Sequence, residues 1–273
     1  MNPNTLEKQI SAAYDNDALL AQADYIEAIQ RTIGLLDAGK IRVAEKRGND
    51  WAVNEWIKKA ILLYFKIRRI EKIEIGPFEF FDKIPLKRNF ERQQVRVVPP
   101  GMARYGSYLA PGVVLMPGYV NIGAYVDRGS MVDTHATVGS CGQVGKGVHI
   151  AGAARVGGVL EPPQSRPVII EDNAFLGSAV SVMEGVLVRE EAVLGAGVIL
   201  TSSTKIIDVS GSQTVEYRGE IPPRSVVIPG SYEKTFPAGK YQIQCALVIG
   251  KRKESTDKKV SLNAVLRDFN IAV

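Results

Sequence analysis

The sequence predicts a mainly β protein with a parallel β-helix at its centre, a helical domain before it and a small extension of strands and a helix after it. Three observations predict this arrangement. Aliphatic residues recur every six positions through the middle of the chain, apolar residues at helical spacing precede that region, and two strand-like runs follow it. The expected divisions are residues 1–95, 96–205 and 206–273.

The first region is predicted to be mostly helical. DYIEAIQRTIGLLDAGKI carries apolar residues at three- and four-residue spacing, with Asp24 as the expected cap and Gly39 as the expected stop. NEWIKKAILLYFKIRRI repeats the pattern and is expected to be capped by Asn54. GPFEFFDKIPLKRNF then indicates a connector with an extended portion.

The central region repeats every six residues, and LEPPQSRP interrupts it with a two-residue change of phase. The repeated positions are Val114, Val120, Val126, Val132, Val138, Val144, Ile150 and Val156, then Ile170, Leu176, Val182, Val188, Leu194 and Leu200. Weaker units are expected at Met102 and Tyr108, which gives about five coils in all. The interruption predicts a loop outside the stack near residues 160–168.

A six-residue repeat of this kind indicates triangular coils, in which each unit is one short strand and one corner. The aliphatic residue is expected to point to the axis and to stack on its equivalent in the next coil. The residue four places on is usually small or β-branched, which suits a tight corner. The polar residue directly after the aliphatic then points outward, and this is the placement predicted for Asp133 after Val132.

The third region contains RSVVIPGSY and KYQIQCALVIGKRK, two strand-like runs separated by the turn signal FPAGK. A short helix is expected in SLNAVLRDFN, with Ser261 as its cap. Extensions of this kind commonly cover the open edges of a stack of strands.

Composition disfavours several classes of protein. The net charge of +5 suits an anionic small ligand, and no basic stretch is interleaved with aromatic residues as in a nucleic-acid binding surface. The two cysteines, Cys141 and Cys245, form neither a disulfide framework nor a metal motif. We expect neither a signal peptide nor a membrane span, and therefore a cytoplasmic protein.

Hexapeptide repeats of this type are found in the left-handed β-helix acyltransferases, and the left hand is taken from that resemblance. Within them, this chain resembles the tetrahydrodipicolinate N-succinyltransferase family over nearly its whole length. The matching segments are RVVPPGMARYG, VLMPGYVNIGAYVDRGSMVDTHATVGSCGQVGKGVHI, GGVLEPPQSRPVIIEDNAFLGS, STKIIDV and RSVVIPGSY, together with AGKIRVAEKRG.

The resemblance implies a homotrimer with active sites in the clefts between neighbouring prisms. It implies succinyl-CoA or another acyl-CoA as co-substrate, with no permanently bound cofactor. The implied acceptor is a cyclic imine dicarboxylate, tetrahydrodipicolinate, which reacts as ring-opened 2-amino-6-oxopimelate in lysine and diaminopimelate biosynthesis. No metal, nucleic acid or membrane is implied as a partner.

The family's substrate-binding arginine falls on Arg96 in RVVPP, and its acceptor-binding aspartate falls on Asp133 in MVDT. A guanidinium suits one carboxylate of a dicarboxylate substrate. Asp133 would bind the acceptor's ammonium group and help to remove its proton, and it is the predicted catalytic residue. The structural alternatives are a solvated corner residue for Asp133 and a surface cation for Arg96.

Several positions depart from the family pattern. His135 replaces the usual tryptophan, Ala179 replaces an arginine found in many members, and Ser181 replaces a glutamate that is often present and thought to act in catalysis. The family's GKNVHLSGGVGIGGVLEP is here GKGVHIAGAARVGGVLEP. Without that glutamate, deprotonation would fall to Asp133, a water or another acid such as Glu184. His135 is a further candidate base, although a histidine that replaces an aromatic ring more often fills space.

Other binding roles are predicted from residue type. Backbone amides of AGAARVGGVL, which includes Gly158, would suit an oxyanion, although tight corners also require glycine. His135, Gly158 and Ser181 are therefore the expected pocket residues beside Asp133. The candidate cations for the phosphates of CoA are Lys205, Lys251, Arg252 and Lys253. Cys141 is expected to pack at a corner rather than to act as a nucleophile.

Three other functions are weighed against this one. The first is an acyltransferase on the same scaffold with acetyl-CoA as donor or with another acceptor, in a specialised pathway. The second is a zinc lyase of the carbonic-anhydrase type, which needs three histidine ligands, whereas this chain has only His135 and His149. The third is a non-catalytic scaffold.

Overall fold

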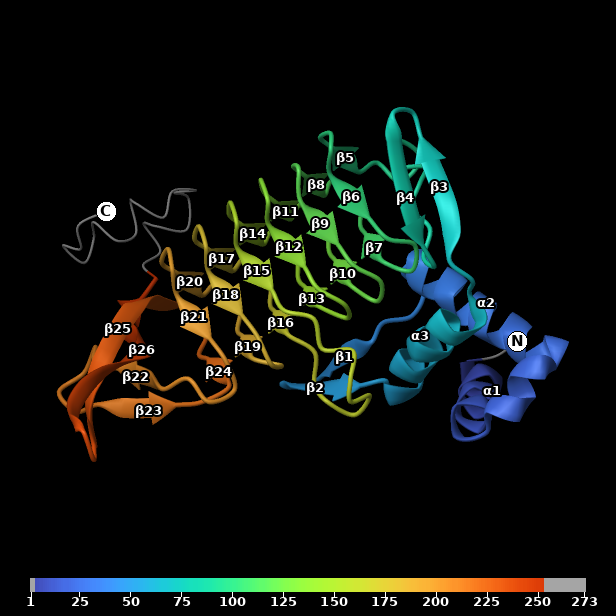
Figure 1. The fold of residues 1–273 in the computed structure, drawn as a ribbon. Helices are drawn as coiled ribbons and strands as arrows, with labels where there is room; N and C mark the ends of the chain where they lie inside the picture. Colours follow the sequence, from blue (N-terminus) through green and yellow to red (C-terminus); the bar gives the residue numbers. More distant parts are fainter. Residues whose placement is uncertain (1–2, 253–273) are drawn as a thin grey trace.

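The computed structural model describes residues 3–252. The N-terminal domain and the C-terminal hairpin lie at opposite ends of a long stack of short strands (Figure 1). The N-terminal elements are α1 (Pro3–Asp15), the 3-10 helix η1 (Asp17–Ala21), α2 (Ala23–Asp37), β1 (Ala44–Arg47), β2 (Asp50–Val53), α3 (Glu55–Ile67), β3 (Glu71–Ile75) and β4 (Phe78–Asp82). The expected helix in SLNAVLRDFN lies outside the described residues.

Both predicted helices are present, and of the predicted end signals only the cap at Asp24 is wrong. Gln22, not Asp24, is the N-cap of α2, and Asp24 lies in the first turn, where a carboxylate interacts favourably with the helix dipole. The backbone leaves the helix before Gly39, whose φ of 66° is the left-handed conformation that glycine adopts readily. Asn54 is the N-cap of α3 as predicted, yet its side chain donates to the carbonyl oxygen of Arg42 instead of capping the helix.

The central stack has three faces of parallel two-residue strands, which confirms the predicted β-helix. Face 1 contains β5 (Arg96–Val97), β8 (Val114–Leu115), β11 (Met131–Val132), β14 (His149–Ile150), β17 (Phe175–Leu176), β20 (Val193–Leu194) and the start of β25 (Ser225–Phe236). Face 2 contains β6 (Met102–Ala103), β9 (Tyr119–Val120), β12 (Thr137–Val138), β15 (Arg155–Val156), β18 (Ser181–Val182) and β21 (Ile199–Leu200). Face 3 contains β7 (Tyr108–Leu109), β10 (Tyr125–Val126), β13 (Gln143–Val144), β16 (Ile169–Ile170), β19 (Leu187–Val188) and β24 (Glu220–Ile221).

The inward residues form one continuous core, and the predicted repeat is confirmed from Val120 onward, where every predicted aliphatic is buried. The first coil corrects the prediction. Leu115, not Val114, points inward and pairs in register with Val132. Likewise Ala103 and Leu109 are the buried residues beside the predicted Met102 and Tyr108. The unit between Leu115 and Val120 is one residue short, so the phase changes there.

At many corners the backbone adopts the left-handed conformation, and several of the residues there are not glycine. Cys141 adopts φ 68° at such a corner and packs, fully buried, in the core of the N-terminal domain. Burial raises the pKa of its thiol to about 12, so it stays protonated and the predicted packing role is confirmed. The interruption LEPPQSRP forms a loop between β15 and β16, held by the buried Lys58, whose Nζ donates to the carbonyl oxygen of Ser165 (2.7 Å).

The C-terminal strands extend the stack and close its end. The predicted pair of strands is confirmed as an antiparallel hairpin of β25 and β26 (Gly239–Lys251). β26 also pairs with β22 (Ile206–Asp208), which pairs with β23 (Val215–Tyr217). Ile221 and Val227 continue the buried core beyond residue 205. Within residues 3–252, no helix combines the length and the apolar character needed to cross a bilayer.

Candidate active site

The predicted catalytic residue lies at the edge between faces 1 and 2, called here the catalytic edge. It consists of the corners 133–136, 151–154 and 177–180, which join β11 to β12, β14 to β15 and β17 to β18. Asp133 follows the fully buried Val132 and turns outward, with 29% of its side chain exposed. Its Oδ1 accepts hydrogen bonds from the backbone N (2.7 Å) and Oγ1 (3.2 Å) of Thr134. Oδ1 is therefore held in place while Oδ2 faces the neighbouring coil.

The group that faces Asp133 is His149, which sequence analysis considered only as a metal ligand. Its Nε2 lies 3.8 Å from Oδ2 of Asp133. The two residues come from adjacent strands, because Met131 pairs in register with His149. The imidazole stacks on the ring of Phe175 in the next coil, with centroids 5.0 Å apart and planes 20° apart. The six-residue repeat could have predicted this contact, because His149 follows Met131 by 18 residues, which is one full coil.

Three departures from the family motif occupy one column of corners. His135, Ala153 and Ala179 all have φ near 58°. Each is bonded to the coil before it, as when Ala153 N donates to Thr134 O (2.9 Å) and Ala179 N donates to Gly152 O (3.0 Å). The column is therefore continuous along the catalytic edge. The side chain of His135 is exposed at its start, and the structure gives it no contact with Asp133 among the described residues.

Two further departures are neighbours on face 2. Ser181, at the position of the family's frequent glutamate, pairs in register with Arg155, at a glycine of the family motif. Ser181 is nearly buried, whereas Arg155 is exposed. Sequence analysis did not single out Arg155. The departures from the family motif therefore lie on the catalytic edge and beside it. Together they remove an arginine at position 179 and a glutamate at position 181, and they add the positive charge of Arg155.

Arg96 lies on face 1 at the exposed start of the stack. Its strand β5 is separated from β11 only by β8, so at about 4.8 Å per strand it lies about 10 Å along the face from Asp133. The structure therefore places the two predicted substrate-binding residues on the same face but not in contact within one chain.

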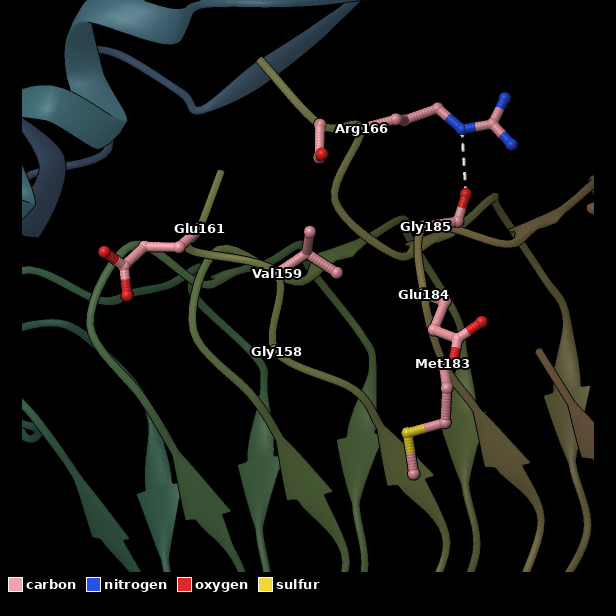
Figure 2. Close-up of a pocket in the computed structure, with 8 residues that line it drawn as sticks. Gly158, Val159, Glu161, Arg166, Met183, Glu184 and Gly185 are labelled. Carbon is pink, nitrogen blue, oxygen red and sulfur yellow. Dashed lines mark hydrogen bonds between the residues drawn. The ribbon is translucent and has the colours of Figure 1, made fainter. Parts of the chain in front are cut away.

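Gly158 lies at the opposite edge of face 2, in a pocket between the external loop and the corner 183–185 (Figure 2). Arg166 spans this pocket, and its Nε donates to the carbonyl oxygen of Gly185 (2.8 Å). A Cβ on Gly158 would lie 2.9 Å from the backbone N of Ser140, so close packing of the coils requires a glycine here. The pocket and Asp133 occupy different edges of one prism.

Glu184, the alternative acid, also lines this pocket. Its Oε2 accepts hydrogen bonds from the hydroxyl (2.6 Å) and the backbone N (3.1 Å) of Ser202. The hydroxyl bond and the backbone bond lower the pKa of Glu184, which makes it a weaker base. Its position and its hydrogen bonds both make it a poor substitute for the family's glutamate.

Among the described candidate CoA-binding cations, Lys205 lies apart from the consecutive residues Lys251 and Arg252. Lys205 pairs with Glu216 (3.0 Å) and lies over the ring of Tyr232, towards the middle of the β25–β26 hairpin. Lys251 donates to Pro223 O (2.9 Å) at the base of that hairpin. Arg252 donates to Asn173 O (3.2 Å), and Lys253 lies outside the described residues. Their role in CoA binding stays a prediction.

Metal chemistry finds no support in the part of the chain that is described. Residues 3–252 contain no group of three or more His, Cys, Asp or Glu side chains arranged to hold a metal ion. The donor set for the zinc lyase is therefore missing from these residues, since two histidines are too few for three histidine ligands.

Comparison with known proteins agrees with this architecture. Residues 5–67 match the family model described as tetrahydrodipicolinate N-succinyltransferase N-terminal, and residues 167–202 match the hexapeptide repeat of succinyl-transferase. A 2,3,4,5-tetrahydropyridine-2,6-dicarboxylate N-succinyltransferase from Azoarcus sp. (strain BH72) is 50% identical over 96% of this chain and 98% of its own length. Its counterpart from Ehrlichia ruminantium (strain Gardel) is 52% identical over 88% of this chain and 87% of its own.

A solved structure, that of a putative 2,3,4,5-tetrahydropyridine-2-carboxylate N-succinyltransferase from Campylobacter jejuni, is 16% identical with a TM-score of 0.43. It covers 82% of this chain and 63% of its own. The identities near 50% over almost the full length of the relatives are decisive. This chain belongs to the tetrahydrodipicolinate N-succinyltransferase family.

Proposed function

We propose that this protein transfers a succinyl group from succinyl-CoA to the amine of tetrahydrodipicolinate, which reacts as ring-opened 2-amino-6-oxopimelate. The observation that carries the proposal is Asp133, the aspartate of the family motif, held outward at the catalytic edge with Oδ2 open to a ligand. The names of the relatives supply the acceptor and the succinyl group, and the family resemblance implies CoA as the carrier of that group. The reaction belongs to lysine and diaminopimelate biosynthesis, and we expect it to take place in the cytoplasm.

In this reaction the acceptor's amine nitrogen attacks the thioester carbonyl of the donor. A C–N bond forms and the C–S bond breaks. The ammonium nitrogen loses two protons in all, of which one is taken up by the thiolate of CoA and the other is released to solvent. Asp133 binds and orients the ammonium group before it loses its proton. Arg96 binds one carboxylate of the acceptor through its planar guanidinium. Backbone N–H groups near Gly158 stabilise the oxyanion.

These roles require more than one copy of the chain. Arg96 lies about 10 Å from Asp133 along face 1, and Gly158 lies on the far edge of face 2. We infer a homotrimer in which a neighbouring prism faces the catalytic edge and completes the site. Sedimentation velocity is expected to show a trimer, and an active monomer would contradict this arrangement.

A second candidate is transfer of a different acyl group, or transfer to a different acceptor, on the same scaffold. It is favoured by the clustering of departures on and beside the catalytic edge. At Ala179 and Ser181 two charges common in the family are missing, and Arg155 adds a positive charge one strand away. A pocket with this altered charge pattern would select a differently charged substrate.

Steady-state assays distinguish these possibilities. Release of the CoA thiol is followed with tetrahydrodipicolinate and either succinyl-CoA or acetyl-CoA as donor. The proposed function predicts turnover with the succinyl donor. Turnover with acetyl-CoA alone favours the second candidate, and CoA binding by calorimetry without any turnover indicates a non-catalytic scaffold.

A further inference from the structure

The separation of Asp133 and His149 allows one ligand nitrogen to form hydrogen bonds with both side chains. Their facing atoms, Oδ2 and Nε2, are 3.8 Å apart, too far for a direct hydrogen bond. A nitrogen placed to one side of the line that joins them, at about 2.8 Å from each atom, satisfies both hydrogen-bonding distances. Both side chains are 29% exposed, so the gap is open to a ligand while much of each side chain is held by protein.

The surroundings of His149 favour a neutral imidazole that is ready to accept a proton. Burial lowers its pKa, and the charge of Asp133 opposes this effect without cancelling it. Asp133 faces the imidazole from β11, and the uncharged ring of Phe175 faces it from β17. The stacked ring also fixes the orientation of the imidazole plane.

We propose that His149 is the proton acceptor of the acyl transfer, and that Nε2 of His149 and Oδ2 of Asp133 together hold the attacking amine. The carboxylate binds the ammonium form, which releases one proton to solvent, and this is the net proton that the reaction produces. The freed lone pair then forms the C–N bond, the imidazole takes the second proton from this nitrogen, the C–S electron pair leaves with sulfur, and the imidazolium returns that proton to the thiolate. The proposal deepens the proposed function and rests on it.

Other groups near the catalytic edge suit this role less well. Ser181 replaces the family's frequent glutamate and has no comparable basicity. Glu184 lies at the other edge of face 2 with its oxygen occupied by Ser202. His135 points into solvent from a corner, whereas His149 is held on Phe175 and faces Asp133. His149, which the quoted family motif also carries, is thus the group best placed to act as the base in this chain.

The decisive variant is His149→Gln, which keeps a polar side chain of similar length but cannot take a proton near neutral pH. We expect kcat to fall by at least about a hundredfold, the usual contribution of general-base catalysis. The wild-type enzyme should lose kcat at acidic pH as the imidazole becomes protonated, with the acid limb shifted below the ordinary range of histidine because burial lowers the pKa of His149, and the variant should lack this acid limb. Wild-type kcat in His149→Gln, or an acid limb that survives, would overturn the proposal.

Chemical rescue separates catalysis from packing. In His149→Ala the space beside Phe175 is open, and added imidazole should restore at least about a tenth of the lost rate if a base is what is missing. If His149→Ala keeps the wild-type melting temperature and CoA affinity but its activity is not restored by imidazole, the proposal that His149 is the proton acceptor is also overturned. Arg128→Ala, an exposed cation outside the catalytic edge, serves as the control with unchanged kcat. A wild-type enzyme inactive with both donors would instead contradict the proposed function.

Discussion

Face 3 and the catalytic edge are built from the same six-residue units, yet they differ in what covers them. The N-terminal domain lies on face 3, where the guanidinium of Arg42 stacks on Tyr125 (3.6 Å) and donates to Gln143 (3.1 Å). At the catalytic edge, Asp133 and His149 remain partly exposed, with the gap between them open. An outward polar residue therefore stabilises the fold where another domain packs over it, and it is free to bind a ligand where it stays exposed. The six-residue repeat alone does not determine which of the two occurs.

Glu171 is the buried counterpart of Asp133. It accepts a hydrogen bond from Nε1 of Trp51 (2.8 Å) and pairs with Lys46 (2.9 Å), with only 3% of its side chain exposed. Burial alone would raise its pKa, but hydrogen bonds with Glu190, Trp51 and Lys46 outweigh it and lower the pKa to about 2. Each carboxylate follows a buried aliphatic, but Glu171 is enclosed by Trp51 and Lys46 of the N-terminal domain together with Arg189 and Glu190 of the prism.

The largest expected effect is on turnover at the open edge. Asp133→Asn should lower kcat by at least about a hundredfold while leaving the trimer intact, because the amide cannot balance the charge of the ammonium group. The matched control is Asp127→Asn. Asp127 also follows a buried valine and accepts from the next backbone N (2.7 Å), but on a different edge. Equal kcat in the two variants would contradict the role of Asp133.

At Glu171, which the N-terminal domain covers, we expect a substitution to change stability rather than turnover. Glu171→Gln should lower the free energy of unfolding by about 3 kcal/mol at pH 7, because Lys46 and Arg189 lose a buried charge partner. The folded-state pKa lies below the unfolded value of about 4.3, so this stabilisation is present above that value and is lost as pH falls towards about 2.

Urea titrations at pH 7 and at pH 3 measure the difference between wild type and Glu171→Gln. The difference should shrink at the lower pH, and a constant difference would contradict the assigned role of the charge. Specific activity of the folded variant should match the wild type, since Glu171 lies on the covered side of the prism.

A smaller effect is expected at Arg96. Arg96→Ala should raise the acceptor KM by about tenfold with little change in kcat, as expected for one lost charge-assisted bond to a carboxylate. Arg96→Lys should recover part of the loss, because it keeps the charge without the planar fork. A fall in kcat at unchanged KM would place Arg96 in the chemical step instead.

Much of the fold was predictable because the repeat controls burial directly. The phase change at Leu115 was missed because Val114 and Leu115 are both aliphatic, and sequence alone does not say which one points inward. The hairpin β1–β2 was missed, since its short, charged strands carry little apolar pattern. The hairpin β3–β4 was predicted only in part: β4 lies in the segment expected to contain an extended portion, whereas its partner β3 was not predicted.

The site was predictable only in part, for a related reason. Asp133 was found because it belongs to a motif continuous in sequence. His149 and Arg155 acquire their meaning from neighbours one coil away, through the pairs Met131–His149 and Arg155–Ser181. Such contacts follow from the 18-residue length of a coil once the register is known, and the external loop shifts that register between Arg155 and Ser181.

The smallest effect tests whether the departures at the catalytic edge act together. Ser181→Glu restores the family's frequent residue, but it places the carboxylate beside Arg155 on the adjacent strand. An ion pair there would neutralise it, so kcat with tetrahydrodipicolinate should change by less than about threefold. Arg155→Gly combined with Ser181→Glu should change kcat more than the sum of the two single effects, as a double-mutant cycle would show. Additive effects would mean that the two departures are independent, and that the charge pattern of the edge does not determine the choice of acceptor.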